Sequence, residues 1–237
     1  MPNWVRNECV LKGTEEQMLN LFNDALANSG EEKKDNVQDA LDTLVSNGKH
    51  KESNREDAFD NKPQKRDVVL VKGFTLRTIR PCPDTFLEYD TTNYKDKFEE
   101  QAKEQLKQYG VVGWYDYNVK TLGTKWDAEI EGARLTKQED GTYMFYFTCD
   151  SAWSPITIFL GYLTRQYGVR TFICAIDEGY GFVFYEDSYG NGKDYTQEIA
   201  DLFEKFKDEE ETETLYDEVG RLEDKMIYEF DEFVCQS

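Results

Sequence analysis

The residues best suited to chemistry lie between Gly113 and Pro155, where three of the four tryptophans stand among acidic, basic and hydroxyl side chains. Carboxylates beside a lysine and aromatic rings can bind a small polar ligand or a cation, and paired acids can transfer protons. The sequence therefore predicts a ligand site, either binding or catalytic, formed by Trp114, Asp116, Lys125, Trp126, Asp127, Trp153 and Ser154.

The same residues also have a purely structural interpretation. Ser154 directly precedes Pro155, a pair typical of a helix start with serine as the N-cap and proline at the first helical position. Lys125 would then pair with Asp127 or Asp116, and the tryptophan rings would belong to the core. The sequence leaves the ligand site and this structural interpretation open.

The sequence lacks the residues that other common catalytic and metal sites require. His50 is the only histidine and lies in a polar segment, so a fixed histidine base and mixed Cys/His zinc ligands are not available. The five cysteines are widely spaced without a Cys-x-x-Cys pair, which predicts reduced core residues. Nucleophile-elbow, phosphate-loop and dinucleotide motifs are missing from the sequence. We therefore expect no catalytic residues, no metal and no cofactor.

The 237-residue chain has a net charge of -20, and its last fifth is the most acidic part. Residues 186–237 contain 18 Asp and Glu against 5 Lys and Arg. Such a surface repels phosphate backbones and attracts basic proteins, so we expect no direct binding to nucleic acid. The partner expected instead is a host protein with a basic surface. The alternative is that the charge serves solubility alone.

Two helices are predicted after Gly192. Ile199, Leu202 and Phe203 mark the first, and apolar residues spaced by three and four between Leu215 and Phe233 mark the second. The second helix can dock on the rest of the protein, or pair with a partner or a second copy. Its polar side forms a candidate partner-binding acidic face, comprising Glu209, Glu210, Glu211, Asp217, Glu218, Asp224, Asp231 and Glu232.

Hydropathy patterns predict alternating strands and helices before Gly192. Strands are expected at 5–11, 68–79, 111–119, 126–135, 142–149, 169–176 and 180–186, and helices at 14–26, 98–109 and from 154 onwards. Thr14 and Gln17 form a predicted capping box at the first helix. Residues 30–67 are a polar insertion with one short helical pattern, and 46–66 can be a linker or a segment that orders on binding. This order predicts an α+β protein.

Four short segments carry a resemblance to a known family. They are Met1-Pro2-Asn3-Trp4, Gly113-Trp114-Tyr115-Asp116, Gly123-Thr124-Lys125-Trp126-Asp127 and Ala152-Trp153-Ser154-Pro155. Together they resemble the YubB-type ferredoxin-like domain family of phages and conjugative plasmids, over roughly Met1 to Gly192. The resemblance implies a ferredoxin-like antiparallel sheet with helices on one face, and a mobile genome as the source. It implies no established activity.

The expected organisation is a ferredoxin-like domain over 1–192, with the insertion at about 30–67, and acidic C-terminal helices over 193–237. The expected function is that of a phage or mobile-element accessory protein in the host cytoplasm. It would act by protein-protein binding, as an acidic nucleic-acid mimic that inhibits a host defence or DNA-processing complex. The alternatives are the ligand site described above and a self-assembling structural protein. The sequence has no membrane-spanning run.

Overall fold

A seven-stranded antiparallel sheet forms the centre of the protein in the computed structural model, which describes residues 3–28, 68–70, 74–207 and 212–237. Its strand order is β2-β3-β4-β1-β5-β6-β7. The strands are β1 (Trp4–Gly13), β2 (Val68–Leu70), β3 (Glu131–Lys137), β4 (Tyr143–Ala152), β5 (Arg170–Asp177), β6 (Val183–Asp187) and β7 (Gly192–Asp194). The predicted α+β class is confirmed. The predicted insertion at 30–67 lies entirely outside the described residues.

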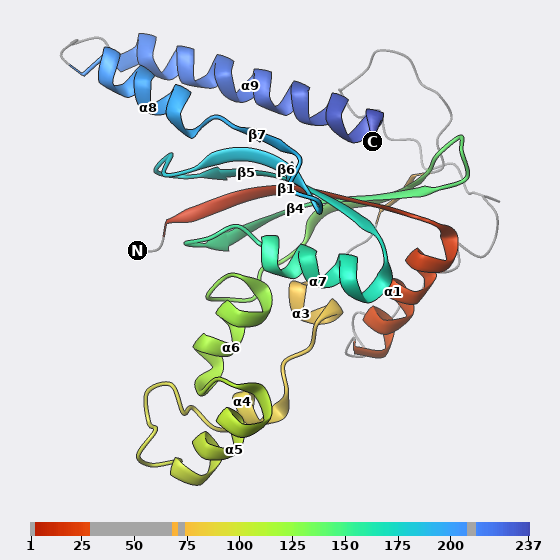
Figure 1. Ribbon diagram of the computed structural model, residues 1–237, viewed down its shortest axis with the longest axis vertical. Helices are drawn as coiled ribbons and strands as arrows, with labels where there is room; N and C mark the ends of the chain where they lie inside the picture. The colour runs from red at the N-terminus through yellow and green to blue at the C-terminus, as the bar shows by residue number, and fades with distance from the viewer. Residues whose placement is uncertain (1–2, 29–67, 71–73, 208–211) are drawn as a thin grey trace.

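Helices cover both faces of this sheet (Figure 1). On one face lie α1 (Glu15–Asn28), α3 (Leu76–Ile79) and α7 (Thr157–Tyr167), and on the other lie α8 (Thr196–Lys205) and α9 (Thr212–Gln236). The helices before Gly192 that pack on the sheet therefore lie on one face, and the helices after Gly192 lie on the other. The physical reason is that β5 and β6 carry apolar residues on both sides, so each face needs a cover.

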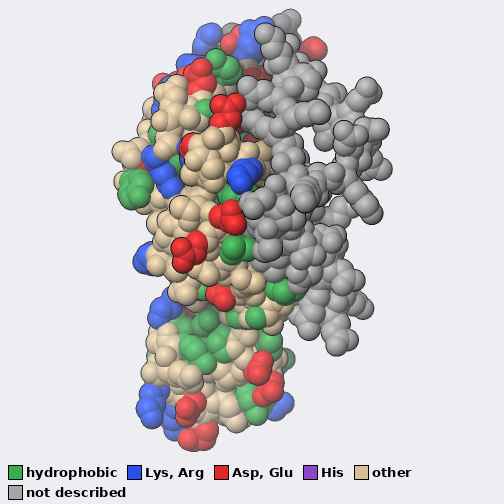
Figure 2. Space-filling model, turned by 90° about the vertical axis from the view of Figure 1, so that its right-hand side faces the viewer, with side chains coloured by type: hydrophobic (Ala, Val, Ile, Leu, Met, Phe, Trp, Pro, Cys, Tyr) green, Lys and Arg blue, Asp and Glu red, His purple; other side chains and the backbone are tan. Residues whose placement is uncertain are grey.

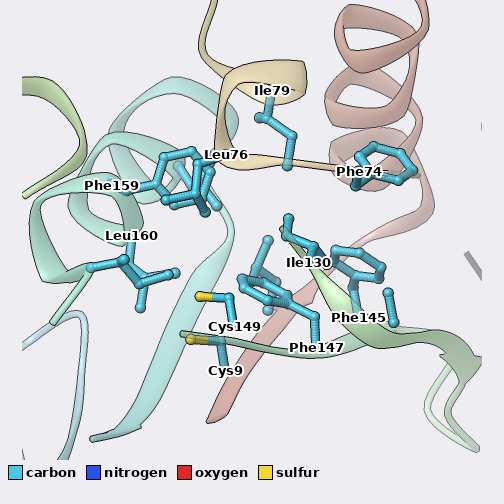
Figure 3. Close-up of a cluster of buried hydrophobic side chains, with 14 of the residues drawn as sticks. Cys9, Phe74, Leu76, Ile79, Ile130, Phe145, Phe147, Cys149, Phe159 and Leu160 are labelled. Atoms are coloured by element: carbon cyan, nitrogen blue, oxygen red, sulfur yellow. The ribbon is translucent and has the colours of Figure 1, made fainter. Parts of the chain in front are cut away.

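The larger core lies between the sheet and α1, α3 and α7. Figure 3 shows Phe145 and Phe147 of β4 directed towards Phe74 and Ile79, with the Cys9 and Cys149 side chains beside them. These residues are almost fully buried. The capping box predicted for α1 is confirmed, because Gln17 N donates to Thr14 Oγ1 and Thr14 N donates to Gln17 Oε1.

The second core lies under α8 and α9. It joins Val10, Phe172 and Tyr185 of the sheet to residues of the C-terminal helices, of which Met226 and Phe230 are almost fully buried. The predicted stripe of α9 is confirmed, because Leu215 and Val219 are buried too, and Leu222 and Phe233 are partly buried. Of the two arrangements that the sequence left open for this helix, the structure contains the docked one.

A lobe of three helices projects from the first face: α4 (Asp84–Glu88), α5 (Glu99–Tyr109) and α6 (Gly113–Leu122). Figure 2 shows hydrophobic side chains gathered on this lobe, with charged side chains around them. The strand predicted at 111–119 is wrong, because these residues form α6. The Tyr117 ring stacks on Phe86 with centroids 4.4 Å apart, so contacts within the lobe select the helix.

Two further strand predictions were too long. Val68–Leu70 pairs with β3, but the chain then turns into α3, where Thr75 and Thr78 form a reciprocal capping box. On the other side, β3 begins only at Glu131, and Glu129 makes a single bridge to Thr75. A short capped helix thus interrupts what the β-branched composition suggested was one continuous strand.

Candidate functional site

Three tryptophans lie exposed near the point where β1 begins and β4 ends. Trp153 is 52% exposed, Trp4 43% and Trp126 37%. The Trp4 and Trp126 ring centroids are 6.0 Å apart, and Trp153 N donates to Asn3 O at 2.9 Å. We call Trp4, Trp126 and Trp153 the tryptophan patch. Exposed tryptophans grouped in this way are typical of contact surfaces, because tryptophan is enriched among residues that dominate binding energy.

Trp153 is held in an unfavourable backbone conformation, with φ of 72°. Left-handed backbone is costly for a bulky side chain and persists only where surrounding contacts impose it. Here Ala152 N donates to Thr124 Oγ1 at 2.9 Å, and that hydroxyl donates back to Ala152 O at 2.9 Å. The hydrogen bonds on both sides of Trp153 therefore fix the backbone from which the indole projects.

A buried asparagine anchors the same turn. Asn7 is fully buried, and its Nδ2 donates to Cys149 O at 3.0 Å and to Ser151 Oγ at 2.9 Å. Its Oδ1 accepts from Ile156 N at 3.3 Å. Ser151 Oγ in turn donates to Ser154 O at 2.7 Å. One side chain of the central strand thus holds the chain on both sides of Trp153.

The predicted polar site is not assembled around these rings. Asp127 accepts from Arg77 N at 3.1 Å and so caps the first turn of α3. Desolvation raises the pKa of its carboxyl, while hydrogen bonds from Thr75, Arg77 and Ala128 oppose the shift. Asp116 lies exposed on α6, and no hydrogen bond or ion pair joins it to Lys125 in the structure.

Lys125 and Trp114 also differ from their predicted roles. The Lys125 ammonium lies 4.6 Å from the Trp126 ring centroid and 5.7 Å from that of Tyr115, and forms no ion pair with a described residue. Trp114 is half-buried on α6, with its ring 6.1 Å from Tyr115. Of the predicted site, only Lys125, Trp126 and Trp153 therefore belong to the exposed aromatic surface or touch it.

Ser154 does not cap a helix. The following helix, α7, begins at Thr157, and its N-cap position is Ile156, which makes no side-chain cap. The main-chain oxygen of Ser154 instead accepts the hydrogen bond from Ser151 Oγ. The serine-proline pair was a good local signal for a helix start, but Asn7 holds the main chain at Ile156 and delays the helix.

Trp4 was missing from the predicted site. The sequence did contain a signal for it, because Val5 and Cys9 point into the core and an alternating strand then directs Trp4 the other way. Its main-chain N donates to Glu178 Oε2 at 3.0 Å. The turn that follows β5 therefore places a carboxylate beside the tryptophan patch.

The acidic face of α9 is the second candidate surface. Asp217, Asp224 and Asp231 are exposed and spaced by seven residues, so they lie on one side of the helix. Desolvation raises the pKa of Asp231 with a further contribution from Glu8, whereas Arg134 opposes it. Residues 213–237 contain eight acidic and two basic residues. Glu209, Glu210 and Glu211 of the predicted face lie outside the described residues.

Two members of this face have partners within the helix. Glu218 forms an ion pair with Arg221, and Glu232 Oε1 accepts from the Tyr228 hydroxyl at 2.8 Å. Tyr228 and Tyr216 are 63% and 60% exposed. The outward side of α9 therefore presents carboxylates interspersed with tyrosine rings, a residue type enriched in protein contact surfaces.

A groove of about 320 Å³ separates α8 from α9. It is lined by Glu198, Leu202, Glu218, Arg221, Leu222 and Lys225. The lining includes acidic and basic side chains, and Leu202 and Leu222 are its apolar members. Within the described residues, no group of three or more His, Cys, Asp or Glu side chains is arranged to hold a metal ion.

No protein-family model, curated protein or solved structure matches this chain. In the part of the chain that the structure describes, none of the helices combines the length and apolar character needed to cross a membrane.

Proposed function

We propose that this protein acts by binding another protein that presents a basic surface, and that the acidic face of α9 makes the contact. The observation that carries the proposal is the division of α9 into two sides. Met226 and Phe230 anchor one side in the second core, which leaves Asp217, Asp224 and Asp231 directed outward from a fixed helix. A fixed row of carboxylates attracts and orients a basic partner.

Nucleic-acid imitation is the specific form of this proposal. A rigid helix with carboxylates at regular intervals carries the same sign of charge as a phosphate backbone. A basic groove that binds nucleic acid would therefore attract it, although the helix has no bases. The protein would then be an accessory protein of a phage or mobile element that occupies a host defence or DNA-processing complex in the cytoplasm. Direct binding to nucleic acid is not expected, because both surfaces are negative.

The resemblance to the YubB-type ferredoxin-like family supports this setting. The elements β1, α1, β3, β4, α7 and β5 follow one another with the spatial strand order β3-β4-β1-β5. This is the order of a β-α-β-β-α-β unit, which supports a ferredoxin-like arrangement for the part before Gly192. On this proposal α8 and α9 are an acidic addition to that unit.

The test compares two triple variants of the full chain in a pull-down from nuclease-treated host lysate. The first carries Asp217→Asn, Asp224→Asn and Asp231→Asn. The control carries Glu16→Gln, Glu104→Gln and Glu139→Gln, which remove the same charge from exposed positions elsewhere. We expect a basic partner that binds the wild type and the control, is lost with the first variant, and is displaced by duplex DNA. Equal binding by both variants contradicts the proposal.

A ligand-binding or catalytic site at the tryptophan patch is a second candidate function, favoured by the strained, exposed Trp153. Because Asp127 caps α3, its loss cannot separate ligand binding from folding. Lys125→Ala is the better variant, since this side chain contacts only rings and donates no side-chain hydrogen bond to a described residue. If a small ligand binds here, Lys125→Ala weakens its binding with no change in the unfolding midpoint. Unchanged ligand binding in that variant rejects the site.

A further inference from the structure

Three arginines gather where α3, α6 and α7 meet, although the chain as a whole is strongly acidic. Arg77 and Arg80 come from α3 and its C-terminal cap, and Arg165 comes from α7. Arg165 is exposed, whereas Arg77 and Arg80 are half-buried. We call Arg77, Arg80 and Arg165 the arginine cluster.

Contacts with α7 bring two of these guanidinium groups together. The Arg80 guanidinium carbon lies 4.2 Å from the centroid of the Tyr162 ring. Arg165 is three residues further along α7, which places it on the same side of the helix as Tyr162. Its Nη1 lies 3.2 Å from where a side chain on Gly161 would begin, so the guanidinium lies beside Gly161, one turn back along α7.

Arg77 joins the cluster from the side of α6. Its guanidinium carbon lies 5.2 Å from the Tyr117 ring centroid, and its Nη2 donates to Asn118 Oδ1. Its Nη1 donates to Arg80 O at 3.3 Å, and Arg80 Nη1 donates to Thr121 O at 2.5 Å. These acceptors are neutral, so the hydrogen bonds position Arg77 and Arg80 without forming ion pairs.

None of the three arginines forms an ion pair with a described residue. By contrast, Arg6, Arg170 and Arg221 each pair with a carboxylate. The nearby Asp127 accepts the main-chain N–H of Arg77 rather than its guanidinium. Desolvation raises the pKa of Asp127 and the charge of Arg77 opposes that rise, so one described carboxylate lies near the cluster without forming an ion pair with it.

The electrostatic consequence is mutual repulsion. Desolvation lowers the pKa of Arg80, and the neighbouring charges of Arg77 and Arg165 lower it further, against the opposing effect of Tyr117 and Tyr162. A bound anion would relieve this repulsion. Guanidinium groups suit oxyanions in particular, because their planar forks donate two parallel hydrogen bonds to two oxygens.

We propose that the arginine cluster is a binding site for a phosphate dianion, either free or as a phosphate monoester. Three neighbouring positive groups, of which Arg165 is exposed, match a doubly charged oxyanion better than a single carboxylate. Since Arg77 and Arg80 also bond to α6, a bound phosphate would tie the lobe of α4, α5 and α6 more firmly to the sheet. The site is separate from α9 and does not depend on the function proposed above.

The test is calorimetric titration of the full chain with inorganic phosphate at about pH 8, where the dianion predominates, with ionic strength held constant by sodium chloride. Because the net charge of the protein repels anions in general, saturable one-to-one binding indicates a specific site. We expect Arg165→Gln to weaken phosphate binding at least about tenfold. The matched control is Arg221→Gln, which removes the same charge at an exposed position on α9 and should bind like the wild type.

The second arm identifies the source of the phosphate. If phenyl phosphate binds more tightly than inorganic phosphate, the site is assigned to a phosphate monoester. If it binds more weakly, the site is assigned to the free ion. Acetate should bind neither the wild type nor the variants. Absence of saturable phosphate binding to the wild type, or equal binding by wild type and Arg165→Gln, overturns the proposal. Arg165 is exposed, so the far-ultraviolet circular dichroism of its variant should match the wild type.

Discussion

Asp187 and Arg170 form a buried ion pair that ties the end of β6 to the start of β5. Asp187 Oδ2 lies 2.6 Å from Arg170 Nη2, and the Asp187 side chain is fully buried. The arginine also donates to Ser237 O at 2.8 Å. This one pair therefore fastens two strands and the far end of α9, which places the acidic face of α9 relative to the sheet.

Acid should weaken the fold through Asp187. Desolvation acts to raise the pKa of this carboxyl, but hydrogen bonds from Arg170, Asn191 and Tyr189 outweigh it and lower the pKa to about 2. Because the folded-state pKa lies below the ordinary value of 3.8, the stabilisation is fully present above that pH and is lost as the pH falls towards 2. The amount lost is roughly 2 kcal/mol.

Urea unfolding of wild type and Asp187→Asn at several pH values measures this contribution. Asparagine cannot titrate, so the difference in unfolding free energy between the two proteins should shrink between about pH 4 and pH 2. A constant difference across that range contradicts the assignment.

Glycine should be tolerated better than alanine at position 153. Both Trp153→Gly and Trp153→Ala remove the indole, but only glycine adopts a φ of 72° without strain. We expect the glycine variant to be more stable than the alanine variant by about 1 kcal/mol. Thermal unfolding gives the comparison, and the reverse order would show that the left-handed conformation at this residue is not strained.

Shortening Phe230 should detach α9 from the sheet. This ring is almost fully buried among Tyr185 and other residues of the second core. Phe230→Ala should cost about 3–5 kcal/mol in unfolding free energy. Tyr228→Ala is the matched control, because Tyr228 lies on the same helix and is 63% exposed. Similar losses from both variants would contradict the docked arrangement.

A side chain at Gly113 should disrupt the start of α6. Gly113 has a φ of 84°, and a Cβ there would lie 2.8 Å from the main-chain N and Cα of Thr92. Gly113→Ala should therefore cost at least about 2 kcal/mol, since strain and a backbone clash add. Gly141→Ala is a suitable control, because it also has positive φ but has open space around it. Chemical denaturation should show a clearly larger loss at Gly113.

Much of the architecture could be predicted from the sequence because its signals were local and repeated. The strand expected at 5–11, the Thr14 and Gln17 capping box and the apolar stripe of α9 each match the structure. In each case the residues that form the pattern also make the contacts that stabilise the element. The presence of a mixed helix and strand protein with an acidic last helix followed from these patterns, whereas the docking of that helix was left open.

The failures came where distant residues decide the local structure. Val111 to Val119 alternates like a strand, but Phe86 and Thr92 of the lobe select a helix. Asp127 was expected beside Lys125, but the capped turn of α3 brings Arg77 N to it instead. Neither partner is close in sequence, so neither could be read from a local pattern.

The sequence by itself determined which segments bury apolar side chains and how much negative charge the surface must carry. Only the tertiary structure decided which charges remain without a partner. It paired Arg170 with Asp187, whereas Arg77, Arg80 and Arg165 form no ion pair with a described carboxylate. The physical reason is that apolar burial depends on spacing along the chain, whereas an ion pair depends on the distance between groups far apart in sequence.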